Sequence, residues 1–183
     1  MAKEEALQFK GDEDDDEGII SLDRLFFVDR NYELTEFTFG SNSLQLLCLR
    51  SASTDYDLTG QLVWPGAVLM NNYLSSHAQI LSDRSVIELG SGVGITGMLC
   101  SRFCREVVLT DHNDEVLEII RKNIDLEASR RNQSLLGLTT EKLEWGNREH
   151  IEQILQKHPS GFDLVLGADI YILFKMFSHE FVT

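Results

Sequence analysis

Val86-Ile-Glu-Leu-Gly-Ser-Gly-Val-Gly-Ile-Thr-Gly97 is the stretch that decides the fold of this 183-residue chain. A short β-branched and apolar run leads into glycines at positions 90, 92 and 94, and a helix-like stretch follows. A strand, a glycine turn and a helix in this order bring the backbone and a helix N-terminus close to a nucleotide-type ligand. The segment therefore predicts a ligand site beside the turn.

Strands and helices are expected to alternate around this turn. Apolar periodicity and turn residues predict strands over residues 85–89, 107–109, 138–143 and 162–166, and helices over residues 67–81, 95–103, 112–128 and 148–157. Upstream, residues 32–39 and 44–49 form a β-hairpin pattern around a turn at residues 40–42. Strands that are apolar throughout and separated by helices are typical of a parallel sheet covered on both faces. We expect an α/β fold with a Rossmann-like parallel sheet and an N-terminal hairpin, in one domain over residues 21–183.

The net charge of the chain argues against certain classes of binding partner. The formal net charge is −14 at pH 7, whereas a nucleic-acid backbone or an anionic membrane calls for a basic surface. Eight acids and two lysines lie in residues 1–18, so we expect residues 1–20 to be a disordered tail that attracts a basic protein or keeps the chain soluble. The sequence shows neither a signal peptide nor an apolar run of membrane-spanning length. We expect no nucleic-acid and no membrane partner, and the oligomeric state is not indicated.

The three cysteines, Cys48, Cys100 and Cys104, indicate a reducing compartment, the cytosol or the nucleus, because an odd and small number does not make a disulfide scaffold. Cys100 and Cys104 share a face of an expected helix, but no histidine or second cysteine pair completes a zinc site. We expect buried core thiols and no metal.

Two cofactors fit the glycine loop. Residues 92–97 match the dinucleotide pattern G-x-G-x-x-G, with Asp111 at about the distance of a ribose-binding acid. That match begins three residues after the strand, however, whereas the first dinucleotide glycine normally sits at the strand end. The pattern acid-x-Gly-x-Gly-x-Gly is met in full by Glu88, Gly90, Gly92 and Gly94. This pattern is the first motif of class I S-adenosylmethionine methyltransferases, and acids beside the loop favour a cationic cofactor without phosphate.

Five ordered segments carry a wider resemblance: Gly60-Gln-Leu-Val-Trp64-Pro-Gly-Ala, Val86-Ile-Glu-Leu-Gly-Ser-Gly-Val-Gly, Val108-Leu-Thr-Asp111, Leu143-Glu-Trp145-Gly and Leu166-Gly-Ala-Asp169. Together with the hairpin, they resemble the methyltransferase-like protein-lysine methyltransferases of the seven-β-strand superfamily. The resemblance implies that the loop carries the methionine part of S-adenosylmethionine, that the acid after the second strand binds ribose, and that the tryptophans flank the cofactor. The implied cofactor-binding residues are Trp64, Glu88, Gly90, Ser91, Gly92, Gly94, Asp111, Trp145 and Ala168, and the implied catalytic residues are Asp169 and Tyr171.

The chain departs from the family pattern in two places. The family has an aromatic residue three places after the acid of the fourth strand, whereas here Tyr171 comes one place early, so that Tyr171 and Phe174 are both candidates to face the lysine. The chain also ends at Thr183, soon after the fourth expected strand. The resemblance implies three further strands, so we expect a C-terminally truncated chain with an incomplete sheet and an exposed edge.

Simpler interpretations stay open for several of these residues. Trp64 and Trp145 can be ordinary core aromatics, and Glu88 can be a surface acid at a strand end. Asp111 and Asp169 can each cap a helix.

The function we expect is transfer of a methyl group from S-adenosylmethionine to a lysine side chain of a protein. The amine would displace the sulfonium directly, and the enzyme would align the groups and lower the lysine pKa by desolvation. Asp169 would orient the amine or take its proton through water. Two alternatives stay open: a truncated relative that binds cofactor or a partner without turnover, and an NAD-dependent oxidoreductase, against which the position of Glu88 argues.

Overall fold

The computed structural model describes residues 32–49, 56–132, 135 and 137–170, all of which belong to one compact unit, Asn31–Thr183. The expected tail, residues 1–20, lies outside the described residues, as do Tyr171 and Phe174. The predicted α/β architecture with a parallel sheet is confirmed.

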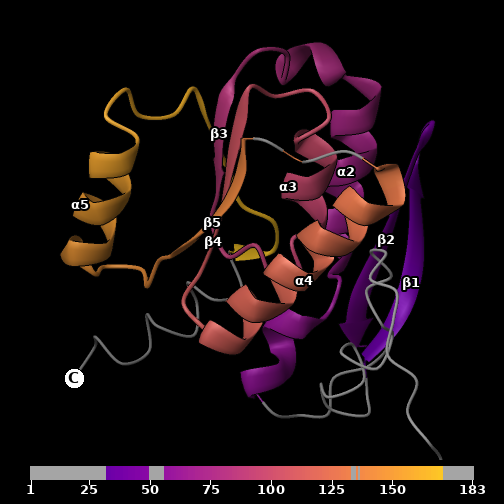
Figure 1. Cartoon of the computed structure of the whole chain (residues 1–183), viewed down its shortest axis with the longest axis horizontal. Coiled ribbons are helices and arrows are strands. Elements are labelled where there is room, and N and C mark those ends of the chain that lie inside the picture. The colour runs from indigo at the N-terminus through magenta and orange to yellow at the C-terminus, as the bar shows by residue number, and fades with distance from the viewer. Residues whose placement is uncertain (1–31, 50–55, 133–134, 136, 171–183) are drawn as a thin grey trace, which may run out of the picture. The chain divides into compact units, whose positions relative to one another are not determined.

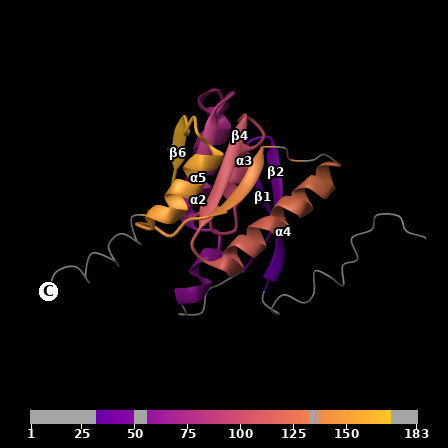
Figure 2. The same cartoon turned by 60° about the vertical axis from the view of Figure 1, so that its left-hand side comes forward.

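The centre of the fold is a four-stranded parallel sheet of β3 (Ser85–Glu88), β4 (Glu106–Asp111), β5 (Leu138–Lys142) and β6 (Leu164–Leu166). The strand order is β5-β4-β3-β6, with β6 at one edge (Figure 2). Along the chain, β4 is added beside β3 and β5 is added beside β4. The chain then crosses back, and β6 pairs with the other side of β3. A reversal of this kind opens a crevice at the carboxyl ends of the strands.

Helices cover both faces of the sheet (Figure 1). On one face lie α2 (Pro65–Ser76), α3 (Ile95–Cys100) and α4 (Asp114–Arg131), and on the other face lies α5 (Arg148–Lys157). The predicted antiparallel hairpin of β1 (Tyr32–Phe39) and β2 (Asn42–Leu49) packs on the outer side of α2, α3 and α4. The glycine turn connects β3 of the sheet to α3 of the helix layer, and the hairpin covers the outer side of that layer.

Two apolar cores hold these layers together. The larger core lies between the sheet, the first helix layer and the hairpin, and its buried residues include Leu46, Leu74, Val86, Met98 and Ile120. The smaller core lies under α5 and consists of Ile87, Val108, Leu143 and Ile154. Neighbouring strand residues such as Val86 and Ile87 enter different cores, because successive side chains of a strand point to opposite faces. This double burial explains the consecutive apolar residues of β3 and of the middle of β4. The edge strand β5 departs from the expected apolar pattern, since four of its five residues are polar and only Leu138 is buried.

The start of α4 differs from the prediction. The helix begins at Asp114 rather than at His112, because the Asn113 side chain accepts hydrogen bonds from two N–H groups of the first turn. The interpretation that Asp111 caps this helix is therefore wrong. Asp111 instead ends β4, which is longer than the predicted strand at residues 107–109.

Other element ends shift by a few residues. α2 begins at Pro65 and ends at Ser76, where a short 3-10 helix, η2 (Ala78–Ile80), replaces the expected last turn. α3 ends at Cys100, before the expected residue 103. A second 3-10 helix, η1 (Tyr56–Gln61), was not predicted, and it brings the chain toward the glycine turn.

Cys48, Cys100 and Cys104 are free. Of the pair expected to be buried, Cys100 is buried and Cys104 is half-buried, and Cys48 is buried as well. Within the described ranges, no helix has both the length and the apolar character needed to cross a membrane. The same ranges contain no group of three or more His, Cys, Asp or Glu side chains arranged to hold a metal ion.

Candidate functional site

Residues from all four strands meet at the carboxyl edge of the parallel sheet. The glycine loop, residues 90–94, follows β3, and Asp111 ends β4. Trp145 lies shortly after β5, and Ala168 and Asp169 follow β6. β3 and β6 are also the neighbours between which the strand order reverses. The predicted residues therefore gather where an open α/β sheet binds its ligand.

The glycine loop has a backbone shape that glycine alone adopts without strain. Gly90, Gly92 and Gly94 have φ angles of +63°, +53° and +85°, in the region that favours glycine. Neighbours also crowd the loop. A Cβ on Gly90 would lie 3.4 Å from Cζ2 of Trp145, and a Cβ on Gly92 would lie 3.0 Å from the carbonyl oxygen of Gly60. The fold of the loop thus requires these glycines before any ligand is considered.

Several N–H groups of the loop are already hydrogen-bonded within the protein. Ser91 N–H donates to the carbonyl oxygen of Thr110 at 2.8 Å, and Gly94 N–H donates to that of Ser91 at 2.9 Å. Gly92 N–H donates to Oδ2 of Asp111 at 3.3 Å. The Ser91 hydroxyl in turn accepts from Thr110 N–H at 3.0 Å. Ser91 therefore fastens the loop to β4, and these N–H groups are not offered to a phosphate.

Asp111 is a buried carboxylate that links the loop to the end of β4. The residue is 6% exposed. While Oδ2 accepts from Gly92 N–H, Oδ1 accepts from Asn113 N–H at 3.1 Å and lies 3.3 Å from Nδ1 of His112. A carboxylate oxygen carries more than one lone pair, so each oxygen can still accept from a ligand hydroxyl. The geometry is compatible with the predicted ribose contact.

Glu88 is buried beneath the loop, and its interpretation as a surface acid is wrong. The residue is 2% exposed, and its Oε2 accepts from Gly97 N–H at 3.0 Å, which joins the end of β3 to α3. Burial raises the pKa of Glu88 from 4.5 to about 7, although the hydrogen bond from Gly97 N–H lowers it in part. The site thus contains a carboxyl group that changes charge near neutral pH. Its contact with a cofactor stays a prediction.

The two predicted tryptophans are both half-buried. Trp64 is the N-cap residue of α2, and its indole Nε1–H donates to the carbonyl oxygen of Thr59 at 2.8 Å. Trp145 packs against the smaller core and approaches Gly90. Neither ring is fully enclosed, so both keep surface that a ligand can contact.

Asp169 joins two motifs that are 102 residues apart in the sequence. Its Oδ2 accepts from Ala67 N–H at 3.2 Å in the first turn of α2, where the Trp64 side chain makes no capping hydrogen bond. The carboxylate packs so closely that a Cβ on Gly66 would lie 2.7 Å from Cγ of Asp169. Asp169 itself has a left-handed φ of +58°, which costs a non-glycine residue about 1 kcal/mol. Asp169 thus caps the first turn of the distant helix α2, a contact that the sequence did not predict. Its predicted roles, as a cap of the helix that follows it and as a catalytic residue, stay predictions.

Ala168 is half-buried against the larger core. Tyr171, the other predicted catalytic residue, lies outside the described residues.

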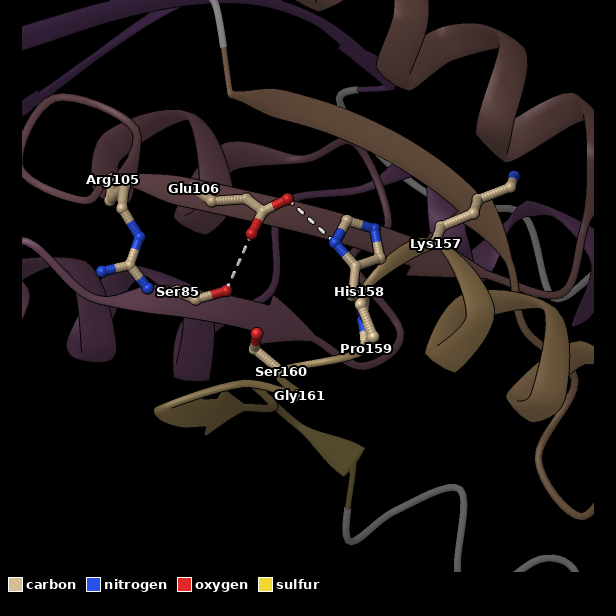
Figure 3. A pocket seen from close by; sticks show the side chains of 8 residues that line it. All are labelled: Ser85, Arg105, Glu106, Lys157, His158, Pro159, Ser160 and Gly161. Carbon is tan, nitrogen blue, oxygen red and sulfur yellow. Dashed lines mark hydrogen bonds and ion pairs between the residues drawn. The ribbon is translucent and has the colours of Figure 1, made fainter.

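A cavity of about 340 Å³ lies at the opposite, amino edge of the sheet, where Ser85 begins β3 and Glu106 begins β4 (Figure 3). Its charged groups are paired with one another or with nearby acids. Glu106 accepts from the Ser85 hydroxyl at 3.0 Å and lies 2.8 Å from Nδ1 of His158. Lys157 and Arg105 each pair with a carboxylate. Because these residues satisfy one another, the carboxyl edge is the better candidate site.

Solved structures identify the class of protein that has this fold. A S-adenosylmethionine-dependent methyltransferase from Agrobacterium tumefaciens superposes with a TM-score of 0.50 at 13% identity, over 78% of this chain and 41% of that chain. A Streptococcus mutans structure assigned to the same class gives a TM-score of 0.51 at 10% identity, over 73% of this chain and 31% of that chain. The chain has the fold of the class I methyltransferases.

The sequence profile of the family described as lysine methyltransferase matches residues 45–180, and the chain belongs to this family. Histone-arginine methyltransferase METTL23 of Xenopus laevis is 30% identical over 126 residues, which are 68% of this chain and 50% of that protein. Protein N-lysine methyltransferase METTL21A of Mus musculus is 29% identical over 147 residues, which are 79% of this chain and 61% of that protein. The chain thus spans about half the length of the curated relatives it matches.

Sequence reasoning missed residues that hold the site together. Asn113 could have been found, since an asparagine just before acidic residues is a helix-start signal. Thr110 and Gly66 gave no such signal, because their partners, Ser91 and Asp169, are close only in the folded chain.

Proposed function

We propose that this chain carries the S-adenosylmethionine site of a protein-lysine N-methyltransferase. One observation carries the proposal: buried carboxylates, Glu88 and Asp111, adjoin a glycine loop whose N–H groups on Ser91, Gly92 and Gly94 are used internally. The pyrophosphate of a dinucleotide needs such N–H groups free. S-adenosylmethionine has no phosphate, and its amino group and sulfonium are cationic. The Asp111 carboxylate, joined by Glu88 where that group is ionised, therefore favours this cofactor over NAD.

The residues at the carboxyl edge fit this cofactor. Asp111 would accept hydrogen bonds from the ribose hydroxyls, and the glycine loop would lie against the methionine part. The exposed parts of Trp64 and Trp145 would flank the cofactor. When bound, S-adenosylmethionine supplies a methyl carbon that is open to direct displacement, so that the protein needs no covalent nucleophile.

The protein's own contribution would be to position and desolvate the amine. Exclusion of water lowers the pKa of a lysine and makes the neutral, nucleophilic form available. The Asp169 carboxylate is held in place by the first turn of α2. From there it would accept a hydrogen bond from the incoming amine and align its lone pair with the methyl group.

Lysine is the acceptor that the family description supports, and METTL21A of Mus musculus is named a protein N-lysine methyltransferase. The arginine-directed name of METTL23 makes arginine the competing acceptor. The net charge of −14 supports a protein substrate over nucleic acid or an anionic membrane. The free thiols of Cys48, Cys100 and Cys104 support the cytosol or the nucleus as the location.

Transfer of label identifies the acceptor directly. The purified chain is incubated with tritium-labelled S-adenosylmethionine and a cell extract, and the labelled protein is hydrolysed for amino-acid analysis. The proposal expects label in methylated lysine, and loss of that label with Asp111→Ala. Label in methylated arginine alone would contradict the choice of acceptor. Cofactor binding without transfer to any protein would favour the alternative of a binding relative.

A further inference from the structure

Asn123 of α4 is a buried polar residue that reaches both the hairpin and the glycine loop. It is fully buried, with 0% exposure. Its Oδ1 accepts from Leu47 N–H at 2.7 Å, and its Nδ2 donates to the carbonyl oxygen of Leu47 at 3.1 Å. The same Nδ2 donates to the carbonyl oxygen of Val93 at 3.0 Å. One amide group therefore ties α4 to two segments that are far apart in the sequence.

The contact with Leu47 gives β2 a partner on its free side. In an antiparallel pair, residues alternate between directing their N–H and C=O groups toward the neighbouring strand and away from it. Leu47 directs both groups toward Asn123, whose amide offers one acceptor and one donor in the same way as a strand neighbour. The position of the hairpin on α4 is thereby fixed by hydrogen bonds as well as by apolar packing.

The contact with Val93 falls at the centre of the glycine loop. Val93 lies between Gly92 and Gly94, and both glycines have left-handed φ angles. Glycine populates many backbone conformations, so the loop needs outside bonds to keep a single shape. Ser91 and Asp111 supply such bonds on the β4 side. Asn123 supplies the bond on the α4 side, where it holds the carbonyl oxygen of Val93.

We propose that Asn123 is a positioning residue for the cofactor, which makes the N-terminal hairpin part of the support of the glycine loop. The inference rests on the proposed function, because the loop it positions is the one assigned to S-adenosylmethionine. Preorganised loops bind tightly because they lose little freedom on binding. A substitution that removes the hydrogen bonds of Asn123 therefore weakens cofactor affinity, although no group that touches the cofactor is removed.

Glu127 offers a matched control, because it lies one turn further along α4 and also docks the hairpin. It is 1% exposed and pairs with Arg102 at 2.7 Å and with Arg130 at 3.0 Å. Both arginines donate to the carbonyl oxygen of Ser43 in β2. No hydrogen bond described for Glu127 reaches the glycine loop. A variant of Glu127 therefore loosens the same helix–hairpin contact and leaves the loop alone.

The experiment measures binding of S-adenosylhomocysteine by calorimetry to the full chain and to Asn123→Leu and Glu127→Gln, together with their melting temperatures. Both variants should melt earlier. Asn123→Leu should weaken binding about tenfold, the scale of one lost hydrogen bond to a buried group, whereas Glu127→Gln should change it less than about twofold. Equal weakening by both variants, or unchanged binding by Asn123→Leu, would overturn the inference. Failure of the wild-type chain to bind would instead contradict the proposed function.

Hydrogen exchange of the wild-type chain gives a second readout that needs no variant. Coupling between two sites is reciprocal, so a ligand on the loop must also strengthen the Asn123–Leu47 contact. S-adenosylhomocysteine should therefore slow exchange of the Leu47 amide more than that of Ser43, which lies at the Glu127 end of the same strand. Equal slowing at the two amides, or none at Leu47, would overturn the inference even if Asn123→Leu did not fold.

Discussion

Replacing Glu88 with glutamine should remove a pH dependence from the stability of this fold. Burial raises the pKa of Glu88 from 4.5 to about 7 in the folded chain. Between pH 4.5 and about 7, Glu88 keeps its proton in the folded chain but has lost it in the unfolded chain. The folded state is therefore stabilised at acidic pH, and this stabilisation is lost as the pH rises through about 7. At about 1.4 kcal/mol per pKa unit, the full shift corresponds to about 3 kcal/mol of folding free energy.

Urea denaturation of the wild type and of Glu88→Gln tests this reasoning. Glutamine keeps the size of the side chain and an acceptor for Gly97 N–H, but it carries no charge. Between about pH 5.5 and about pH 8.5, the wild type should lose about 2 kcal/mol of stability relative to the variant. Other titrating groups cancel in this comparison. Parallel pH profiles for the two proteins would refute the argument that burial raises this pKa.

Asp111→Ala should weaken binding of S-adenosylhomocysteine by about 1.5–3 kcal/mol, the cost of hydrogen bonds to a charged group, and an unchanged dissociation constant in calorimetry would mean that the ligand binds elsewhere. Gly92→Val should lower both cofactor affinity and the melting temperature, because a Cβ there would lie 3.0 Å from the Gly60 carbonyl oxygen at a φ of +53°; a thermal-shift titration that matched the wild type would contradict this. Asp169→Ala should cost about 1 kcal/mol of stability as a lost helix cap. Gly66→Ala, which forces the Asp169 carboxylate aside, should also lower the folding free energy. In the double variant the loss should be little larger than that of Asp169→Ala alone, whereas additive losses would show that the two residues do not interact.

The sequence predicted the parallel sheet and the place of the site for two reasons. The strands, helices and glycine turn follow from local patterns, and ligands of open α/β sheets bind at the carboxyl ends of the strands. The helix over residues 148–157 was predicted with its observed ends, since an apolar stripe lies between Asn147, which caps it, and Pro159, which prevents its continuation. The glycine turn was likewise local. Because parallel strands end at one edge, the meeting of residues 90–94 with Asp111 followed from the strand assignment alone.

The remaining features depend on contacts between distant segments, which no short pattern encodes. The roles of Asp169 as a cap of α2 and of Asn123 as a tie to the loop appear only when the chain is folded. Glu88 was placed correctly at a strand end, but its burial depends on how α3 packs over it. The start of α4 is a different case, because Asn113, just before two acidic residues, is itself a local helix-start signal.

Calorimetric titration of the folded chain with S-adenosylhomocysteine, and separately with NAD, tests the central claim most directly. A cooperative thermal melt first establishes that the chain is folded, and Asp111→Ala serves as the control for binding at the carboxyl edge. S-adenosylhomocysteine should bind saturably and more weakly to Asp111→Ala, and NAD should not bind. Binding of NAD alone, or a folded chain that binds neither ligand, would contradict the central claim.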